Sequence, residues 1–231
     1  MGELTALPLF GVTLTLAVFV LAQVLYRRSG SVWLNPVLVS ILAIIALLLA
    51  AGIPYRDYAR GGDLVSFLLG PAVVALAVPL YQRRLELWRR KSAILFGTLA
   101  GSLASIISAC GIAWLLGGSR DVIVSMAPKS VTAPIAIGIA QRIGGIPALT
   151  APVVVMTGCL GAVCGAEFCR LIGIRTPLAT GLAVGTAAHG IGTARMLEID
   201  RLAGTVAGLA IGLNGLATTF LLPLLMMLGG W

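Results

Sequence analysis

The sequence predicts an all-α polytopic membrane protein with about six spans, two interrupted or re-entrant helical segments and an internal inverted repeat. Three observations lead to this fold class. Apolar residues make up 59% of the 231 residues and charged residues only 10%, and the mean hydropathy is +1.05. Basic residues gather between long apolar runs, and prolines and glycines interrupt two of these runs. A soluble domain cannot bury so much apolar surface, so we expect the chain to span a bilayer.

The composition also excludes several function classes. The net charge is +8, but membrane topology accounts for basic residues between apolar runs, so we expect no nucleic-acid partner. No nucleophile with its base, phosphate-binding loop or pair of carboxylates occurs, and we therefore expect no enzyme and no cofactor. We also expect no metal site, because thiols in apolar segments are usually inert. The thiols are those of Cys110, Cys159, Cys164 and Cys169.

The N-terminal part, residues 1–91, is predicted to hold three spans. They cover about residues 4–26, 33–53 and 64–82. The first is long enough to cross the membrane and lacks a preceding basic region, so we expect a span rather than a cleavable signal. The second begins at Asn35-Pro36, a pair typical of a helix start. A polar connector, residues 55–63, leads to the third span.

The remaining part, residues 92–231, is predicted to be a core with three further spans and two broken segments. The spans cover about residues 92–116, 146–169 and 203–228, and the broken segments cover about residues 121–144 and 176–200. Small residues recur every four positions along the first of these spans, which predicts a smooth face for close helix packing. These residues are Gly97, Gly101, Ser105 and Ala109.

The basic residues predict the topology. Arg27-Arg28 and the basic residues of segment 83–91 are separated by two spans, so they share one side, which should be the cytoplasm, and the N-terminus lies outside. If both broken segments cross fully, there are eight spans and Arg170 and Arg175 lie outside. If both re-enter, there are six spans and these arginines return to the cytoplasm, which the charge rule favours. Re-entry would give an inverted repeat, as in many secondary transporters.

The first broken segment carries the polar residues of a candidate anion site. Pro128 and Pro134 lack a backbone donor, so a regular helix cannot continue through them. A helix that begins inside the bilayer offers free N–H groups to an anion, and Lys129 adds a positive charge that is costly at this depth. Ser130 and Thr132 can donate hydrogen bonds to a carboxylate. The alternative is that Lys129 extends to the membrane surface and the hydroxyl groups cap a helix.

The second broken segment contains the chain's one histidine, His189. Gly185, Gly190 and Gly192 allow the backbone to approach a ligand closely. An imidazole that changes charge near neutral pH suits proton coupling or charge-gated anion binding. The alternative is a neutral histidine that stabilises the break by bonding a carbonyl. Close to the segment's end, Arg195 and Glu198 are expected to pair.

The predicted site combines both segments with an asparagine of the last span. Asn214 and Asn35 are candidates to bond backbone groups freed by the breaks. The predicted substrate-binding residues are Lys129, Ser130, Thr132, Thr186, His189, Gly190, Thr193 and Asn214, and the predicted breaks lie at Pro128, Pro134, Gly185 and Gly192.

Several motifs in order resemble the LrgB/CidB family across nearly the whole chain. They are Asn35-Pro36, Tyr55 to Gly62, Gly70-Pro71 through Tyr81, Pro128-Lys129-Ser130-Val131-Thr132, Ile143-Gly144-Gly145-Ile146-Pro147, and Gly185-Thr186 through His189 to Ala194. The resemblance implies a single LrgB-like transmembrane domain over residues 1–231. Two departures reduce the number of hydroxyl groups: Ala133 replaces a second threonine, and Ala187 and Ala188 replace serines.

The resemblance implies two functions. Members of the family are antiholin-like proteins that act with a small holin-like partner of the LrgA/CidA type in murein hydrolase export and lysis control. A plastid relative carries glycolate and glycerate, and some bacterial members are tied to pyruvate uptake. We therefore expect a multi-pass protein of the bacterial inner membrane that carries a small monocarboxylate as a homo-oligomer, with a dimer as the default. The antiholin-like regulator is the alternative.

Overall fold

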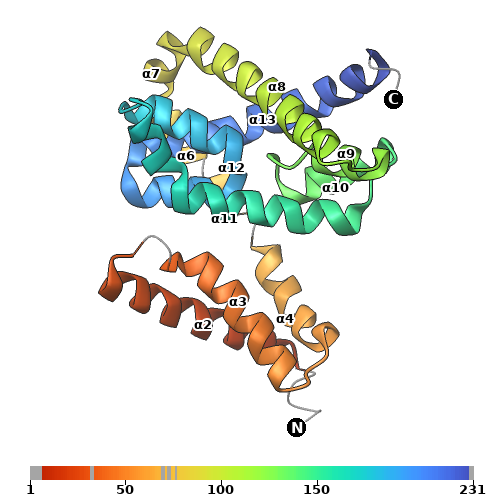
Figure 1. Cartoon of the computed structure of the whole chain (residues 1–231). Coiled ribbons are helices and arrows are strands. Elements are labelled where there is room, and N and C mark those ends of the chain that lie inside the picture. Colours follow the sequence, from red (N-terminus) through yellow and green to blue (C-terminus); the bar gives the residue numbers. More distant parts are fainter. Residues whose placement is uncertain (1–6, 32–33, 69–70, 72–73, 76, 229–231) are drawn as a thin grey trace. The chain divides into compact units, whose positions relative to one another are not determined.

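The computed structural model describes residues 7–31, 34–68, 71, 74–75 and 77–228, and every regular element in these ranges is helical (Figure 1). The all-α prediction is therefore confirmed for this part of the chain. Four described helices are long and apolar enough to cross a membrane, and a fifth apolar helix, Pro36–Ala50, is shorter.

The chain divides into two compact units, Met1–Val78 and Pro79–Trp231. The segment 83–91, which we assigned to the N-terminal part, thus lies in the second unit.

The first unit contains α2 (Pro8–Ser29), α3 (Pro36–Ala50) and α4 (Tyr55–Phe67). The predicted start of α3 is confirmed, because Asn35 Oδ1 accepts the N–H groups of Val37 and Leu38 at 3.0 and 3.3 Å. A side chain in this position satisfies two of the free donors at a helix N-terminus. The hydrogen bonds of Asn35 therefore cap its own helix.

The polar connector predicted at residues 55–63 is helical and belongs to α4. This helix packs closely on α2, as small residues at a helix interface allow. A Cβ added at Gly61 would lie 2.5 Å from the Cα of Gly11, and the hydroxyl groups of Thr15 and Tyr58 are 2.9 Å apart. The predicted third span, residues 64–82, lies partly outside the described residues. Its described ends belong to α4 and to α6 (Ala77–Gln82).

The second unit is built on three long helices with two broken segments between them. In chain order its helices after α6 are α7 (Arg84–Arg89), α8 (Lys91–Leu115), α9 (Arg120–Met126), α10 (Ala133–Arg142), α11 (Pro147–Leu171), α12 (Pro177–Ile199) and α13 (Arg201–Leu228). The long helices α8, α11 and α13 match the three spans predicted for the core. Figure 1 shows α9 and α10 near one end of this unit and α12 near the other, where α7 also lies.

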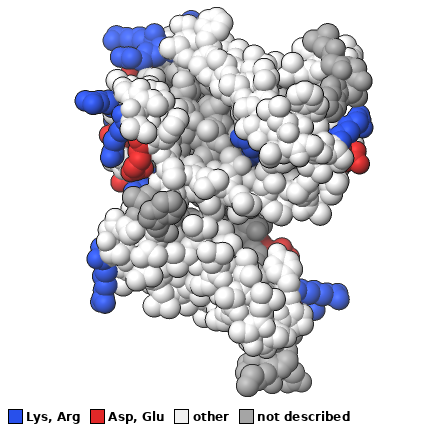
Figure 2. All heavy atoms as spheres, in the orientation of Figure 1, with Lys and Arg blue, Asp and Glu red and all other residues white. Residues whose placement is uncertain are grey.

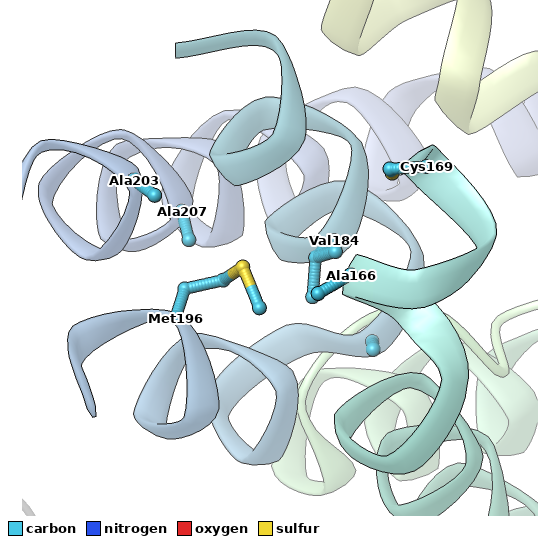
Figure 3. Close-up of a cluster of buried hydrophobic side chains, with 7 residues drawn as sticks. Ala166, Cys169, Val184, Met196, Ala203 and Ala207 are labelled. Carbon is cyan, nitrogen blue, oxygen red and sulfur yellow. The ribbon is translucent and has the colours of Figure 1, made fainter. Parts of the chain in front are cut away.

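Small residues bring the long helices against α12. The predicted packing face of α8 is confirmed at its two glycines: a Cβ at Gly97 would lie 2.8 Å from Leu182 Cδ2, and one at Gly101 would lie 3.0 Å from Thr186 Cγ2. Between α11, α12 and α13 lies a buried cluster in which Met196 is surrounded by small side chains (Figure 3). Its members are Ala166, Cys169, Val184, Ala188, Met196, Ala203 and Ala207.

The basic segment 83–91 lies at the same end of the second unit as both termini of α12. Leu178 and Leu202 pack against a cluster that contains Leu87, and one cavity is lined by Arg170, Arg175 and Asp200. Figure 2 shows Lys and Arg side chains gathered at this end. The six-span interpretation requires this common location, because it puts all these basic residues on one side of the membrane.

Candidate functional site

The first break is a turn of residues 127–132 between α9 and α10. Val131 N–H bonds Pro128 O at 3.2 Å within the turn, and Pro134 occupies the first turn of α10, where its missing donor has no cost. The far end of α10 returns towards α9. The Ile146 N–H donates to Ser125 Oγ at 2.7 Å, and Thr150 Oγ1 donates to Ser125 O at 3.0 Å. The segment therefore begins and ends close to the same place.

The second break lies within α12 at Ala188 and His189, between the two glycines that we assigned to it. His189 has φ +41° and ψ −137°, a backbone conformation that L side chains rarely adopt and that costs about 1–3 kcal/mol. The helix is still regular at Gly185, which lies so close to α13 that an added Cβ would be 2.5 Å from Ala207 Cα. Gly185 therefore serves helix packing, and the departure from helical geometry comes at the histidine.

Contacts with α11 hold the second break in this conformation. His189 is 5% exposed, and its Nε2 lies 2.9 Å from Val154 O. A carbonyl oxygen only accepts, so this nitrogen carries the proton. A Cβ added at Gly158 would lie 2.6 Å from His189 Cε1, which means that only glycine leaves room for the ring. Thr193 Oγ1 donates to His189 O at 2.9 Å and bonds a carbonyl at the break.

Asn214 of α13 joins the two breaks. Its Nδ2 donates to Ser130 O and to Thr186 O, both at 2.9 Å. Its Oδ1 accepts from Ser102 Oγ at 2.6 Å and from Thr218 Oγ1 at 3.3 Å. Both carbonyl groups can only accept, and this fixes the orientation of the amide. The two donor bonds of this buried side chain therefore connect the broken segments, as predicted for an asparagine that bonds freed backbone groups, and its oxygen accepts from α8 and from its own helix.

Lys129 lies beside this junction with its ammonium group among hydroxyl groups. Its Nζ lies 3.3 Å from Ser105 Oγ and 3.2 Å from Ser130 Oγ, and the two hydroxyl oxygens are 2.7 Å apart. The residue is half-buried. Within the described ranges, it forms no ion pair. Two neutral hydroxyl groups solvate the ammonium group and leave its charge uncompensated.

The other predicted residues differ in what their polar groups contact. Thr132 precedes α10 without a side-chain capping bond and is half-buried. Thr186 is buried, and its Oγ1 has no hydrogen-bond partner. Gly190 is exposed at the second break, and Pro128 is buried in the first. Near the end of α12 the predicted ion pair is confirmed, with Arg195 Nη1 3.0 Å from Glu198 Oε2.

Sequence reasoning missed the partners that support these groups. The four-residue spacing of small residues predicts only helix packing for Ser105, although it carries a hydroxyl group in an apolar span on the same face as Ser102, which bonds Asn214. The spacing of these two serines could have indicated a polar stripe. No sequence signal points to Val154, because it contributes only its backbone carbonyl.

These elements define a multi-pass helical membrane protein with two broken segments joined by a buried asparagine. The chain belongs to the LrgB-like family, which it matches over residues 15–228. It is 37% identical to YwbG of Bacillus subtilis over 213 residues, covering 92% of this chain and 95% of that protein. It is 30% identical to the holin-like protein CidB of Staphylococcus epidermidis over 217 residues, covering 94% and 95%. No solved structure matches the chain.

Proposed function

We propose that this protein is a membrane carrier for small organic monocarboxylates of the glycolate, glycerate and pyruvate type, working by alternating access at its two broken segments. The observation that carries the proposal is the uncompensated charge of Lys129. A charge inside the membrane costs at least about 2.5 kcal/mol even on lenient scales, so it rarely lies there without a function. The carboxylate of a substrate would supply the missing counter-charge. The proposed activity requires no covalent chemistry and no cofactor.

The residues proposed to bind substrate fall into two groups. Lys129, Ser130 and Thr132 lie at the turn before α10, where the free N–H groups of a helix N-terminus favour an anion. Thr186 and Gly190 would contribute from the second break, and the unpaired hydroxyl of Thr186 supports this part of the proposal. Three further residues, His189, Thr193 and Asn214, would hold the two breaks in position from the edge of the site.

The proposed topology has six spans, with both broken segments re-entering from opposite sides. It is supported by the location of both ends of α12 at the end of the unit that bears segment 83–91. With the basic end in the cytoplasm, the N-terminus would lie outside a bacterial inner membrane. The opposed re-entry is the inverted-repeat arrangement of secondary transporters. A homodimer is part of the proposal, and light scattering of the purified protein tests it.

The decisive experiment compares two lysine variants in proteoliposomes. We expect Lys129→Gln to reduce the initial rate of radiolabelled pyruvate and glycolate uptake at least about tenfold, because a lost charge-assisted contact costs about 1.5–3 kcal/mol. The matched control is Lys91→Gln. Lys91 is an exposed lysine at the start of α8, 4.3 Å from the centre of the Trp88 ring, and its loss should leave uptake unchanged. Equal uptake by wild type and Lys129→Gln would remove the proposed site.

The second candidate function is an antiholin-like regulator that assembles with a holin-like partner of the LrgA/CidA type to control murein hydrolase export and lysis. The observation that favours it is the relative named holin-like protein CidB. Vesicles loaded with carboxyfluorescein test this function. A regulator would change dye leakage only when the partner is reconstituted with it and would move no labelled carboxylate by itself.

A further inference from the structure

A cavity of about 390 Å³ opens between the two ends of α12, away from the junction at Asn214. The last turn of α11 and the loop after it contribute Arg170 and Arg175 to its lining, and the first turn of α12 contributes Thr180. Asp200 and Ala203, at the junction of α12 and α13, also line it. The cavity thus lies where the second broken segment begins and ends, at the basic end of the second unit.

The lining favours an anion. Arg170 and Arg175 are both exposed, and the ion pairs found in the described part of the chain involve neither of them. The one carboxylate that lines the cavity belongs to Asp200, and its Oδ1 already accepts the N–H of Ala203 at 2.8 Å as the cap of α13. The positive end of the α12 dipole also faces this region. Two arginines and a helix N-terminus therefore give the lining a positive charge that one capping carboxylate does not cancel.

The arginines are not needed to satisfy the helix ends around them. The C-terminal carbonyl groups of α11 and α12 accept backbone N–H groups instead: Cys169 O from Ile174 at 2.7 Å and Met196 O from Asp200 at 2.9 Å. Arg170 O likewise accepts the N–H of Gly173 at 3.1 Å. The guanidinium groups remain available to a ligand, and their planar donor geometry suits a carboxylate.

The rest of the lining is apolar and closes the cavity towards the second break. Met196 is fully buried between α12 and α13, and Figure 3 shows it among the small side chains of its cluster. Further along, a Cβ added at Gly165 would lie 3.0 Å from Val184 Cγ2, and one at Gly161 would lie 2.1 Å from Ala188 Cβ. A lining that combines two arginines with apolar side chains fits a carboxylate with a short hydrocarbon body.

We propose that this cavity is a cytoplasmic vestibule that binds the small monocarboxylate through Arg170 and Arg175 before it reaches the junction of the two breaks. This inference rests on the proposed carrier function and adds to it a second binding site for the same class of anion. A positively charged cavity raises the local concentration of an anionic substrate. The vestibule therefore determines the substrate concentration at which transport is half-maximal. The junction of the two breaks determines the maximal rate.

The test uses the full chain in proteoliposomes and two pairs of substitutions at the same end of the unit. Arg170→Gln with Arg175→Gln removes the charge of the vestibule. The matched control, Arg89→Gln with Arg90→Gln, removes equal charge outside its lining. We expect the vestibule pair to raise the half-saturating pyruvate concentration about tenfold with the maximal rate unchanged. The half-saturating concentration should then no longer depend on salt. The control pair should change the half-saturating concentration less than about twofold.

Several results would overturn the vestibule. Equal shifts in both pairs would assign the effect to general surface charge, and no shift in the vestibule pair would remove the site. The measurement is repeated in phosphatidylcholine vesicles with and without phosphatidylglycerol. An effect that needs the anionic lipid would assign the cavity to a lipid headgroup instead.

A binding measurement separates failure of the vestibule from failure of the carrier. Calorimetry of the purified protein should detect pyruvate binding at the vestibule. The Lys129→Gln variant should retain this binding, and the Arg170→Gln, Arg175→Gln pair should lose it. Loss of uptake in Lys129→Gln with no defect in the arginine pair would refute the vestibule and leave the carrier function intact. Binding that depends on the arginines in a protein that transports nothing would retain the anion site and refute the carrier.

Discussion

The two breaks interrupt their helices in different ways. The first is a turn of residues 127–132 that prolines impose, and it leaves the half-buried cation of Lys129 among serine hydroxyls. The second is confined to Ala188 and His189 and has no proline. There, the strain of a positive φ is held by packing against Gly158 and a hydrogen bond to Val154 O. The first break presents polar groups, whereas the second is fixed against a neighbouring helix.

This difference indicates that the two segments depend on their surroundings to different degrees. Proline removes the backbone donor wherever the chain lies, so the first break needs little help from its surroundings. A strained histidine is stable only where several contacts with its neighbours fix its conformation. The second break therefore depends on α11 for its shape, and a movement of α11 against α12 would alter the junction. Asn214 is shared by both breaks, so its loss should affect them together.

The largest effect should follow the loss of that shared side chain. Asn214→Leu leaves Ser130 O and Thr186 O without their donor, and two buried unpaired groups cost about 2–6 kcal/mol. Thermal unfolding of the purified protein measures the loss. The matched control is Thr219→Val, on the same helix, whose hydroxyl bonds only the Gly215 carbonyl of its own helix. Similar unfolding temperatures for the two variants would show that the junction does not stabilise the fold.

A smaller loss should distinguish the packed second break from the first. Gly158→Ala places a Cβ 2.6 Å from the current position of His189 Cε1, so the ring must move and its bond to Val154 O is weakened. Such overpacking typically costs about 1–3 kcal/mol. Gly212→Ala is the control, because an added Cβ there meets nothing within 4 Å; it should be neutral or stabilising. A loss of stability in both variants alike would contradict the packing argument.

The smallest effect should reveal the strain itself. His189→Ala and His189→Gly both lose the hydrogen bond to Val154 O, but only glycine adopts φ +41° without steric cost. We therefore expect the glycine variant to unfold at a higher temperature than the alanine variant, by about 1 kcal/mol in stability. This order is the reverse of that in a regular helix interior, where alanine is favoured. Finding the ordinary helical order would rule out strain at this position.

Composition and apolar run length were enough to predict the three long helices of the core, because the bilayer fixes both the length and the polarity of a span. The same rules identified residues 55–63 only as a polar connector and did not predict that they belong to a helix. In α4, Gly61 packs against Gly11, a contact between residues far apart in sequence that apolar run length does not reveal. The LrgB-like family was recognisable from its motifs, since these record local residue identities.

For the candidate site, the sequence by itself determined the proline-imposed break and the lysine within it, because both effects depend on the residue's own chemistry. Only the tertiary structure decided that the second break falls at His189 rather than at Gly185 or Gly192, since packing against α11 selects the strained residue. The tertiary structure likewise decided the partners of Asn214. Its two carbonyl acceptors belong to segments that are far apart along the chain, and a one-dimensional pattern carries no information about which of them meet.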